Sequence, residues 1–170
     1  MRRIGITGGI GSGKSVVSRL LRIMGYSVYD TDSEAKRLME SSLEVVQKLS
    51  ECFGRDIYHN GRLNRGLLSS RVFGESDKIV LLNSIVHPVV RFDFYRWSES
   101  LNEEICFVES AILYESRFDE LVDEVWTVTA PEELRISRVR QRSGLTEEEI
   151  KKRMAAQLSE EEKQRRAAHI

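Results

Sequence analysis

The sequence predicts an open, mostly parallel α/β sheet flanked by helices, and three observations lead to this fold class. Short runs of apolar and β-branched residues are typical of buried parallel strands. These runs alternate with longer segments in which apolar residues recur at helical spacing. The first run is followed by a glycine-rich loop, and sheets of this kind bind ligands at the carboxyl ends of their strands.

Four segments fit the strands of this sheet, at residues 3–7, 26–29, 105–108 and 125–129. The first is rich in β-branched residues and ends at glycines, which favours a buried strand despite the glycine inside it. The third is entirely apolar, and the fourth is rich in Val and Thr. We therefore expect the last two to occupy central positions.

Helical patterns connect and follow these strands. Between Lys14 and Met24 the apolar residues recur at helical spacing, and Gly25 stands where a helix C-cap is expected. After Pro131 the sequence is helical and densely charged. Two segments there, 146–149 and 159–162, match the capping box that marks helix starts.

The middle of the chain, from Ser33 to about Leu101, carries only helical patterns, interrupted by a turn-like segment at 58–61. With two prolines and no linker-like tract, nothing marks a second independent domain. This block is therefore expected to be a helical insertion that packs on the same core.

Composition narrows the class of protein. The 170 residues include 26 Lys+Arg and 27 Asp+Glu, a balance that excludes a strongly basic nucleic-acid binder. Two distant cysteines, Cys52 and Cys106, form neither a disulfide framework nor a zinc site. No apolar stretch approaches the length of a membrane span or a signal peptide. We expect a soluble, unprocessed cytoplasmic protein with no nucleic-acid or membrane partner, either a monomer or a homo-oligomer.

Gly8 to Ser15 match the pattern G-x-x-x-x-G-K-[ST], which follows a predicted strand and opens a predicted helix. Glycines permit backbone conformations that turn successive N–H groups toward phosphate oxygens at the positive end of the helix. Lys14 would neutralise the outer phosphates, and Ser15 would ligate Mg²⁺. The alternative is a glycine-rich turn that merely precedes Lys-Ser, and the strand-loop-helix context favours the nucleotide interpretation.

Carboxylates follow two of the predicted strands. Asp30 and Asp32 come after the second strand, where Asp32 fits either a helix N-cap or a group that accepts a proton or holds a metal-bound water. These two interpretations are equally well supported by position. Glu109 follows the third strand and could bind a Mg²⁺-bound water.

Four arginines lie on one charged predicted helix, and two of them, Arg138 and Arg142, are four residues apart and share a face. Such runs are often solvated surface. In an enzyme that transfers phosphate, however, the same spacing suits a lid that brings cations to the transferring group. The four are Arg135, Arg138, Arg140 and Arg142.

Several motifs in chain order together resemble the dephospho-CoA kinase family over nearly the whole chain. They are Thr7 to Ser15, Asp30 to Asp32, Leu63 to Arg65, His87-Pro88, Ile112 to Glu115, Arg138 with Arg142, and Arg153 to Gln157. The resemblance implies a P-loop kinase-type fold with a helical substrate-binding insertion and a helical lid. It also implies transfer of the ATP γ-phosphate to the ribose 3′-hydroxyl of dephospho-CoA, the last step of coenzyme A synthesis.

The resemblance places a nucleotide core at about 1–32 and 103–170, a helical CoA-side lobe at about 33–102 and a lid at about 132–158. It implies ATP contacts along the loop, four catalytic residues, four residues facing dephospho-CoA and two near Mg²⁺. The ATP contacts are Gly9, Ile10, Gly11, Ser12, Gly13, Lys14, Ser15 and Val16. The catalytic set is Asp32 as base with Lys14, Arg138 and Arg142; the acceptor set is Arg65, His87, Pro88 and Leu113; and the metal set is Ser15 and Glu109.

The sequence departs from the family pattern at three positions: Asn64 replaces the usual Asp, Ala111 the usual Pro, and Arg135 a common Gln. The family pattern continues through a final strand and helix beyond the position of Ile170. We therefore expect either omitted residues or a truncated protein.

Two other functions remain open from the sequence. One is a small P-loop kinase that acts on a nucleoside monophosphate or a sugar-like hydroxyl, and the other is a nucleotide-dependent switch. The helical insertion and the arginine-rich lid helix favour a kinase. No aliphatic strand followed by Asp, as a switch would supply, is apparent.

Overall fold

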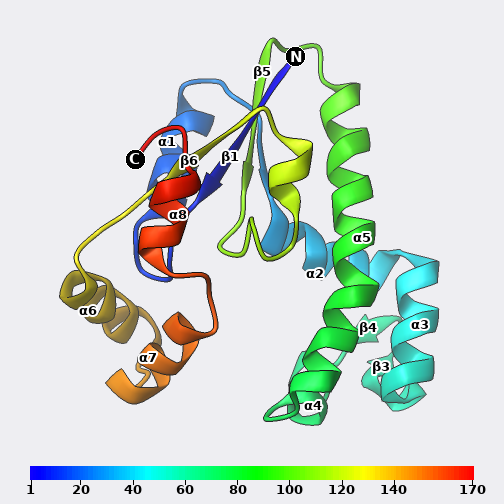
Figure 1. Cartoon of the computed structure of the whole chain (residues 1–170). Coiled ribbons are helices and arrows are strands. Elements are labelled where there is room, and N and C mark those ends of the chain that lie inside the picture. The colour runs from blue at the N-terminus through cyan, green and yellow to red at the C-terminus, as the bar shows by residue number, and fades with distance from the viewer. The chain divides into compact units, whose positions relative to one another are not determined.

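The computed structural model describes residues 1–170, which form two compact units. The core unit comprises Met1–Asp30 and Trp97–Ile170, and the helical unit comprises Thr31–Arg96. Figure 1 traces both units along the chain. The sequence predicts an inserted lobe at about 33–102, and the helical unit spans Thr31–Arg96.

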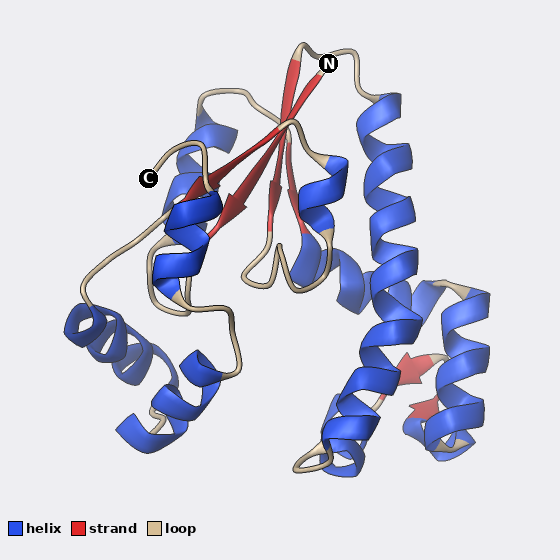
Figure 2. Cartoon of the chain, in the orientation of Figure 1, coloured by secondary structure: helices blue, strands red, loops and turns tan.

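The core unit is built on a four-stranded sheet with the order β2-β5-β1-β6. β1 (Arg2–Thr7) pairs with β5 (Ile105–Glu109) on one side and β6 (Glu124–Thr127) on the other, and β2 (Val28–Asp30) pairs with β5. All pairings are parallel, so the carboxyl ends of the strands share one edge (Figure 2). The predicted parallel α/β sheet is confirmed, and β5 is central as predicted. The prediction of a central position is wrong for β6, which is the last strand in this order.

An apolar core fixes the first helix on this sheet. Ile6 and Phe107 from the strands and Leu21 from α1 (Lys14–Ile23) are all buried in one cluster, and Trp126 packs edge-on against Phe107 at 5.4 Å. Burial of each such side chain contributes roughly 1.5–3 kcal/mol. The loop that joins β1 to α1 is therefore held between two firmly packed elements.

Three helices follow β6: α6 (Glu132–Ser143), α7 (Glu147–Ala155) and α8 (Glu160–Arg166). The predicted capping box at the start of α7 is present. The Thr146 hydroxyl accepts from the backbone N–H of Glu149, and the Glu149 carboxylate accepts from the backbone N–H of Thr146 at 2.8 Å.

The second predicted capping box, at α8, is only half formed. The Ser159 hydroxyl accepts from the backbone N–H of Glu162 at 3.2 Å. The Glu162 carboxylate, however, pairs with Arg165 and Arg166, which lower its pKa to about 2. The Glu162 carboxylate, which a complete capping box needs as an acceptor for the Ser159 backbone N–H, therefore forms ion pairs within α8 instead.

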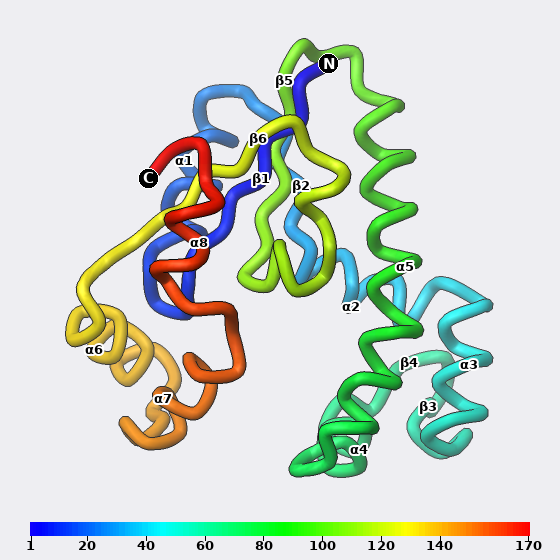
Figure 3. Tube along the Cα trace, viewed as in Figure 1, coloured from blue at the N-terminus to red at the C-terminus, as the bar shows by residue number.

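The last residues of the chain return to β6 (Figure 3). The backbone N–H of Ala168 donates to the Val125 carbonyl, and that of Thr127 donates to the His169 carbonyl, both at 2.8 Å. This parallel bridge adds a short segment to the sheet beside β6.

The helical unit contains α2 (Thr31–Ser41), α3 (Leu43–Phe53), α4 (Arg65–Val72) and α5 (Ser76–Ser100), of which the last residues, from Trp97, belong to the core unit. Within α5 the buried residues recur at every fourth position. They are Val86, Val90, Phe94 and Ser98, and Ile85, next to Val86, is buried as well. The helical patterns predicted for this block are confirmed.

The expected turn at 58–61 lies inside a small β-hairpin, which the sequence pattern does not predict. A short 3₁₀ helix, η1 (Arg55–Ile57), leads into β3 (Tyr58–His59), which pairs antiparallel with β4 (Arg62–Leu63). Asn60 and Gly61 between the strands both have positive φ, as a tight hairpin turn requires. Strands of two residues are too short to show a period of two.

None of the helices has both the length and the apolar character needed to cross a bilayer.

Candidate active site

The loop from Gly8 to Ser15 joins the carboxyl end of β1 to the start of α1, as predicted. Gly8, Gly11 and Gly13 have φ of 144°, 81° and 111°, a region that other residues rarely adopt. A side chain at Gly8 would also collide with the Val128 carbonyl. The glycines thus allow the chain to curl tightly around the helix N-terminus, where anions are stabilised.

Lys14 folds back over this loop. Its ammonium donates to the carbonyl oxygens of Gly8 at 2.7 Å and Gly9 at 3.3 Å. The next residue, Ser15, is exposed in the first turn of α1, as is Val16. Ser12 is buried, and its hydroxyl has no hydrogen-bond partner. Cationic, hydroxyl and backbone donors therefore converge on the loop.

Two carboxylates lie side by side at the edge of the sheet where the loop begins. Asp30, the last residue of β2, is in register with Glu109, the last residue of β5, and Glu109 is in register with Ile6 of β1. Residues in register on parallel strands project from the same face. The sheet edge therefore presents hard oxygen donors next to the strand that feeds the loop.

Asp32 is the second residue of α2, inside its first turn. The interpretation of Asp32 as an N-cap is therefore wrong. A carboxylate in a first turn interacts favourably with the positive end of the helix.

Two arginines of α6 bind the carbonyl side of the glycine-rich loop. Arg135 Nε donates to the Ile10 carbonyl at 3.0 Å, and an Arg138 N–H group donates to the carbonyls of Gly11 at 3.4 Å and Ser12 at 3.2 Å. The structure thus brings Arg138 to the loop. Arg142, the other predicted lid arginine, is exposed on the same helix.

The sequence predicts Arg135 as one charge of a helix that is either solvated surface or a lid, and the structure shows that Arg135 is 4% exposed. Its guanidinium pairs with Glu160 at 3.4 Å. The signal in the sequence was the spacing of Arg135, Arg138 and Arg142, which lie three and four residues apart on one helix face. This spacing indicates a shared helix face but not the segment that the face contacts.

A segment between α7 and α8 contacts both the loop and the chain after β5. The side-chain Oε1 of Gln157 accepts from the backbone N–H of Ile10 at 3.1 Å, and a Glu115 carboxylate oxygen accepts from the backbone N–H of Leu158 at 2.7 Å. The fully buried Lys163 donates to the Ala111 carbonyl at 3.1 Å.

Burial lowers the pKa of the Lys163 ammonium, while the carboxylates of Glu115 and Glu160 oppose that shift. The contacts of this segment and of Lys163 thus connect the glycine-rich loop with the chain after β5.

The comparisons with known proteins agree with this geometry. A family model described as dephospho-CoA kinase matches residues 2–170. A dephospho-CoA kinase of Porphyromonas gingivalis is 45% identical over 161 residues, covering 95% of this chain and 80% of that protein. This chain belongs to the dephospho-CoA kinase family.

Two solved structures have folds similar to that of this chain. The crystal structure of TT1252 from Thermus thermophilus has a TM-score of 0.86 and 39% identity, covering 99% of this chain and 86% of that one. A dephospho-CoA kinase from Campylobacter jejuni has a TM-score of 0.72 and 25% identity, covering 100% of this chain and 88% of that one. The predicted P-loop kinase-type fold is confirmed.

Three of the residues that the dephospho-CoA kinase resemblance assigned to the acceptor lie in the helical unit. Arg65 begins α4 and pairs with Glu40 at 3.3 Å. His87 and Pro88 lie in the interior of α5. Burial lowers the pKa of the His87 imidazole, and the nearby Arg91 charge acts in the same direction, so His87 is mainly neutral at pH 7.

The fourth, Leu113, has a different place. It is fully buried in the core unit, where its side chain packs against Gly5 of β1. A side chain with no exposed surface offers no contact to a substrate. The expectation for Leu113 is corrected: it is a core residue that supports the central strand.

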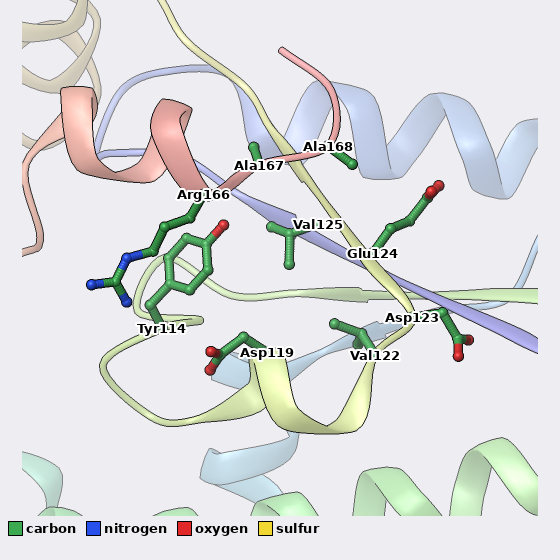
Figure 4. Close-up of a pocket in the computed structure, with 9 residues that line it drawn as sticks. All are labelled: Tyr114, Asp119, Val122, Asp123, Glu124, Val125, Arg166, Ala167 and Ala168. Carbon is green, nitrogen blue, oxygen red and sulfur yellow. The ribbon is translucent and has the colours of Figure 1, made fainter.

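A pocket of about 490 Å³ lies elsewhere in this member of the dephospho-CoA kinase family (Figure 4). It is lined by Tyr114, Asp119, Val122, Asp123, Glu124, Val125, Arg166, Ala167 and Ala168. Several of these residues lie at the start of β6, whereas the glycine-rich loop follows the carboxyl end of β1. None of the residues predicted for ATP, metal or acceptor lines this pocket.

Proposed function

We propose that this protein transfers the γ-phosphate of ATP to the ribose 3′-hydroxyl of dephospho-CoA, giving coenzyme A and ADP. The observation that carries the proposal is the loop from Gly8 to Ser15, which has the phosphate-binding geometry, in a chain matched by the dephospho-CoA kinase family model over residues 2–170. The reaction is the last step of coenzyme A biosynthesis.

The phosphate end of ATP is proposed to lie against the loop. Backbone N–H groups at the start of α1 have no helical acceptor ahead of them and are suited to phosphate oxygens. Lys14, whose ammonium already lies over the loop, would move from the Gly8 and Gly9 carbonyls to the outer phosphates. Phosphoryl transfer asks the protein mainly for such positioning and charge stabilisation.

The residues present also fit Mg²⁺. Ser15 supplies an exposed hydroxyl at the start of α1, and Glu109 supplies a carboxylate at the adjacent sheet edge. These are the oxygen ligands that Mg²⁺ prefers, either directly or through water. When bound, Mg²⁺ supplies positive charge to the phosphates.

Asp32 is proposed as the base that takes the proton of the 3′-hydroxyl. It lies two residues beyond Asp30, whose strand ends at the edge that bears Glu109. Carboxylates in this position of a kinase can orient the hydroxyl and accept its proton in the transition state.

Arg138 and Arg142 are proposed to stabilise charge on the transferring phosphate from a lid at about 132–158, a segment that includes α6 and α7. Arg138 already contacts the loop, which supports its assignment. The acceptor is proposed to contact Arg65 and the segment around His87 and Pro88 in the helical unit.

The free thiols of Cys52 and Cys106 support a reducing compartment, the cytoplasm.

The experiment that tests the proposal supplies ATP, Mg²⁺ and dephospho-CoA and follows coenzyme A formation. A parallel panel supplies nucleoside monophosphates and sugar-like hydroxyl acceptors. Preferential phosphorylation of dephospho-CoA supports the proposal. Transfer to a panel acceptor instead, or slow hydrolysis without transfer to any acceptor, would replace it with the other small-kinase function or the switch.

A further inference from the structure

The peptide groups on both sides of Ile10 are held by side chains from outside the loop. The N–H of Ile10 donates to the Gln157 side chain at 3.1 Å, and its carbonyl accepts from Arg135 Nε at 3.0 Å. Ile10 is the central residue between Gly9 and Gly11, where the backbone has least intrinsic stiffness. Its position is therefore set from outside the loop.

The Arg135 guanidinium lies directly against the loop. A Cβ atom built on Gly9 would collide with the Arg135 guanidinium and with the Glu160 carboxylate, although the backbone of Gly9 does not have a positive φ. A side chain at Gly9 would therefore have to displace the ends of the Arg135 and Glu160 side chains, whereas the backbone conformation of Gly9 permits other residues. The ion pair between Arg135 and Glu160 occupies the space that any side chain at this position would take.

Arg135 is buried in this ion pair, and Glu160 is partly buried. The Arg135 side chain is 4% exposed and that of Glu160 is 19% exposed. One Glu160 carboxylate oxygen is buried without a hydrogen-bond partner. Removing either partner would leave the other as a buried charge with reduced compensation, which is strongly unfavourable.

Binding of the carbonyls by α6 also fixes the direction of the amides. In a planar trans peptide the C=O of one residue and the N–H of the next point in opposite directions. Arginines 135 and 138 bind the carbonyls of Ile10 and Ser12, so the N–H groups of Gly11 and Gly13 point away from α6. Charged donors on the carbonyls also polarise these peptides, which strengthens the N–H groups as donors.

We propose that Arg135, held in place by Glu160, is a positioning residue that shapes the phosphate-binding loop for nucleotide binding. The inference rests on the proposed function for its ligand, a nucleoside di- or triphosphate. Arg135 acts through the Ile10 peptide and touches no reacting atom in this role. Loss of a hydrogen bond to a charged group corresponds to roughly 10- to 100-fold in an equilibrium constant.

The test uses four variants of the whole chain: Arg135→Met, Arg135→Gln, Glu160→Gln and the double variant Arg135→Met/Glu160→Gln. Arg140→Gln, at an exposed position of the same helix, is the matched control. For each variant, ADP affinity is measured by calorimetry and thermal unfolding by circular dichroism. The values of kcat and of KM for ATP are then determined separately in an assay with dephospho-CoA as the acceptor.

Arg135→Met is expected to weaken ADP binding about tenfold or more, with a matching rise in KM for ATP and a smaller change in kcat. Arg135→Gln, which keeps one N–H donor for the Ile10 carbonyl, is expected to retain more affinity. The control is expected to bind ADP like the parent.

The double variant separates positioning from a purely structural role, because it removes both buried charges together. Its melting temperature is expected to recover toward that of the parent, while its ADP affinity stays reduced. Recovery of ADP affinity along with stability would overturn the proposal, as would an Arg135→Met variant that is folded and binds ADP within twofold of the parent.

If Arg135→Met fails to fold, the ADP affinities of the double variant and of Glu160→Gln, compared with that of the parent, test the positioning role instead. A parent chain that binds ADP but does not phosphorylate dephospho-CoA contradicts the proposed acceptor and leaves the ADP comparison intact. A parent that forms coenzyme A beside variants of unchanged ADP affinity contradicts the positioning role alone.

Discussion

A Cβ atom added to Gly5, on the central strand β1, would lie 2.7 Å from Cδ1 of the fully buried Leu113. Gly5→Ala therefore forces a methyl group into a closely packed core. We expect a loss of about 1–3 kcal/mol in the free energy of unfolding, measured with urea. Gly66→Ala is the control, because Gly66 is exposed in a helix and a Cβ atom there would make only an ordinary van der Waals contact with Asn64 Oδ1 at 3.6 Å; it is expected to be neutral or slightly stabilising.

Adding Leu113→Val to Gly5→Ala shortens the side chain that the new methyl group meets. The two substitutions are expected to cost less together than the sum of their separate effects, because the second relieves the first. Strict additivity would show that Leu113 and Gly5 do not compete for the same space.

The Asp32→Asn variant is expected to bind ATP nearly as the parent does and to lose about 10²- to 10⁴-fold in kcat, because the lost interaction forms only in the transition state. Calorimetry gives the affinity and a steady-state assay gives the turnover. Asp77→Asn, another first-turn carboxylate that lies at the start of α5, is the matched control. Near-parental turnover of the Asp32 variant would remove this residue from the mechanism.

A Lys14→Ala variant is expected to lose both nucleotide affinity and turnover, the latter by about 10²-fold or more, since one ammonium serves ground state and transition state alike. The exposed Lys48, paired with Glu44 on α3, provides the control substitution to alanine. Unchanged ATP affinity and turnover in the Lys14 variant would show that the glycine-rich loop does not bind phosphate.

Tyr58 predicts a pH dependence of stability. Its hydroxyl donates to the Met39 carbonyl at 2.6 Å, and burial, with a smaller effect of Glu40, raises its pKa to about 12. In the unfolded chain the same group ionises near pH 10. Between these values the unfolded state holds fewer protons, so rising pH lowers the free energy of unfolding.

The Tyr58→Phe variant should lose about 1 kcal/mol near pH 8 with its hydrogen bond, and a smaller difference from the parent is expected near pH 11. Urea unfolding of both proteins at the two pH values checks this. A difference that stays constant from pH 8 to pH 11 would contradict the raised pKa.

The parallel sheet and the phosphate loop could be predicted because both depend on local patterns. Apolar runs mark the strands β1, β5 and β6, and the spacing from Gly8 to Ser15 is fixed by the phosphate it encloses. The hairpin formed by β3 and β4 escaped prediction because its strands are too short for any periodicity.

Features that depend on long-range pairing could not be predicted. Arg135 belongs to a charged helix that is typical of solvated surface, and only tertiary structure shows that it meets Ile10, 125 positions away in the sequence. Leu113 lies within a family motif, but its burial depends on the absence of a side chain at Gly5 of strand β1. In the second capping box, Arg165 and Arg166 compete for the Glu162 carboxylate.

Glu109 ends β5 in register with Asp30, and this pairing supports a prediction about metal dependence. Glu109→Gln removes the charge but keeps the shape, so we expect the Mg²⁺ concentration at half-maximal rate to rise about tenfold. The rate is measured against Mg²⁺ at saturating ATP. The matched control is Glu104→Gln, an exposed residue just before the other end of the same strand. Because Mg²⁺ is expected to bind the phosphates directly as well, excess Mg²⁺ should restore much of the lost rate. A reduced rate that no Mg²⁺ concentration improves would assign Glu109 a role other than metal binding.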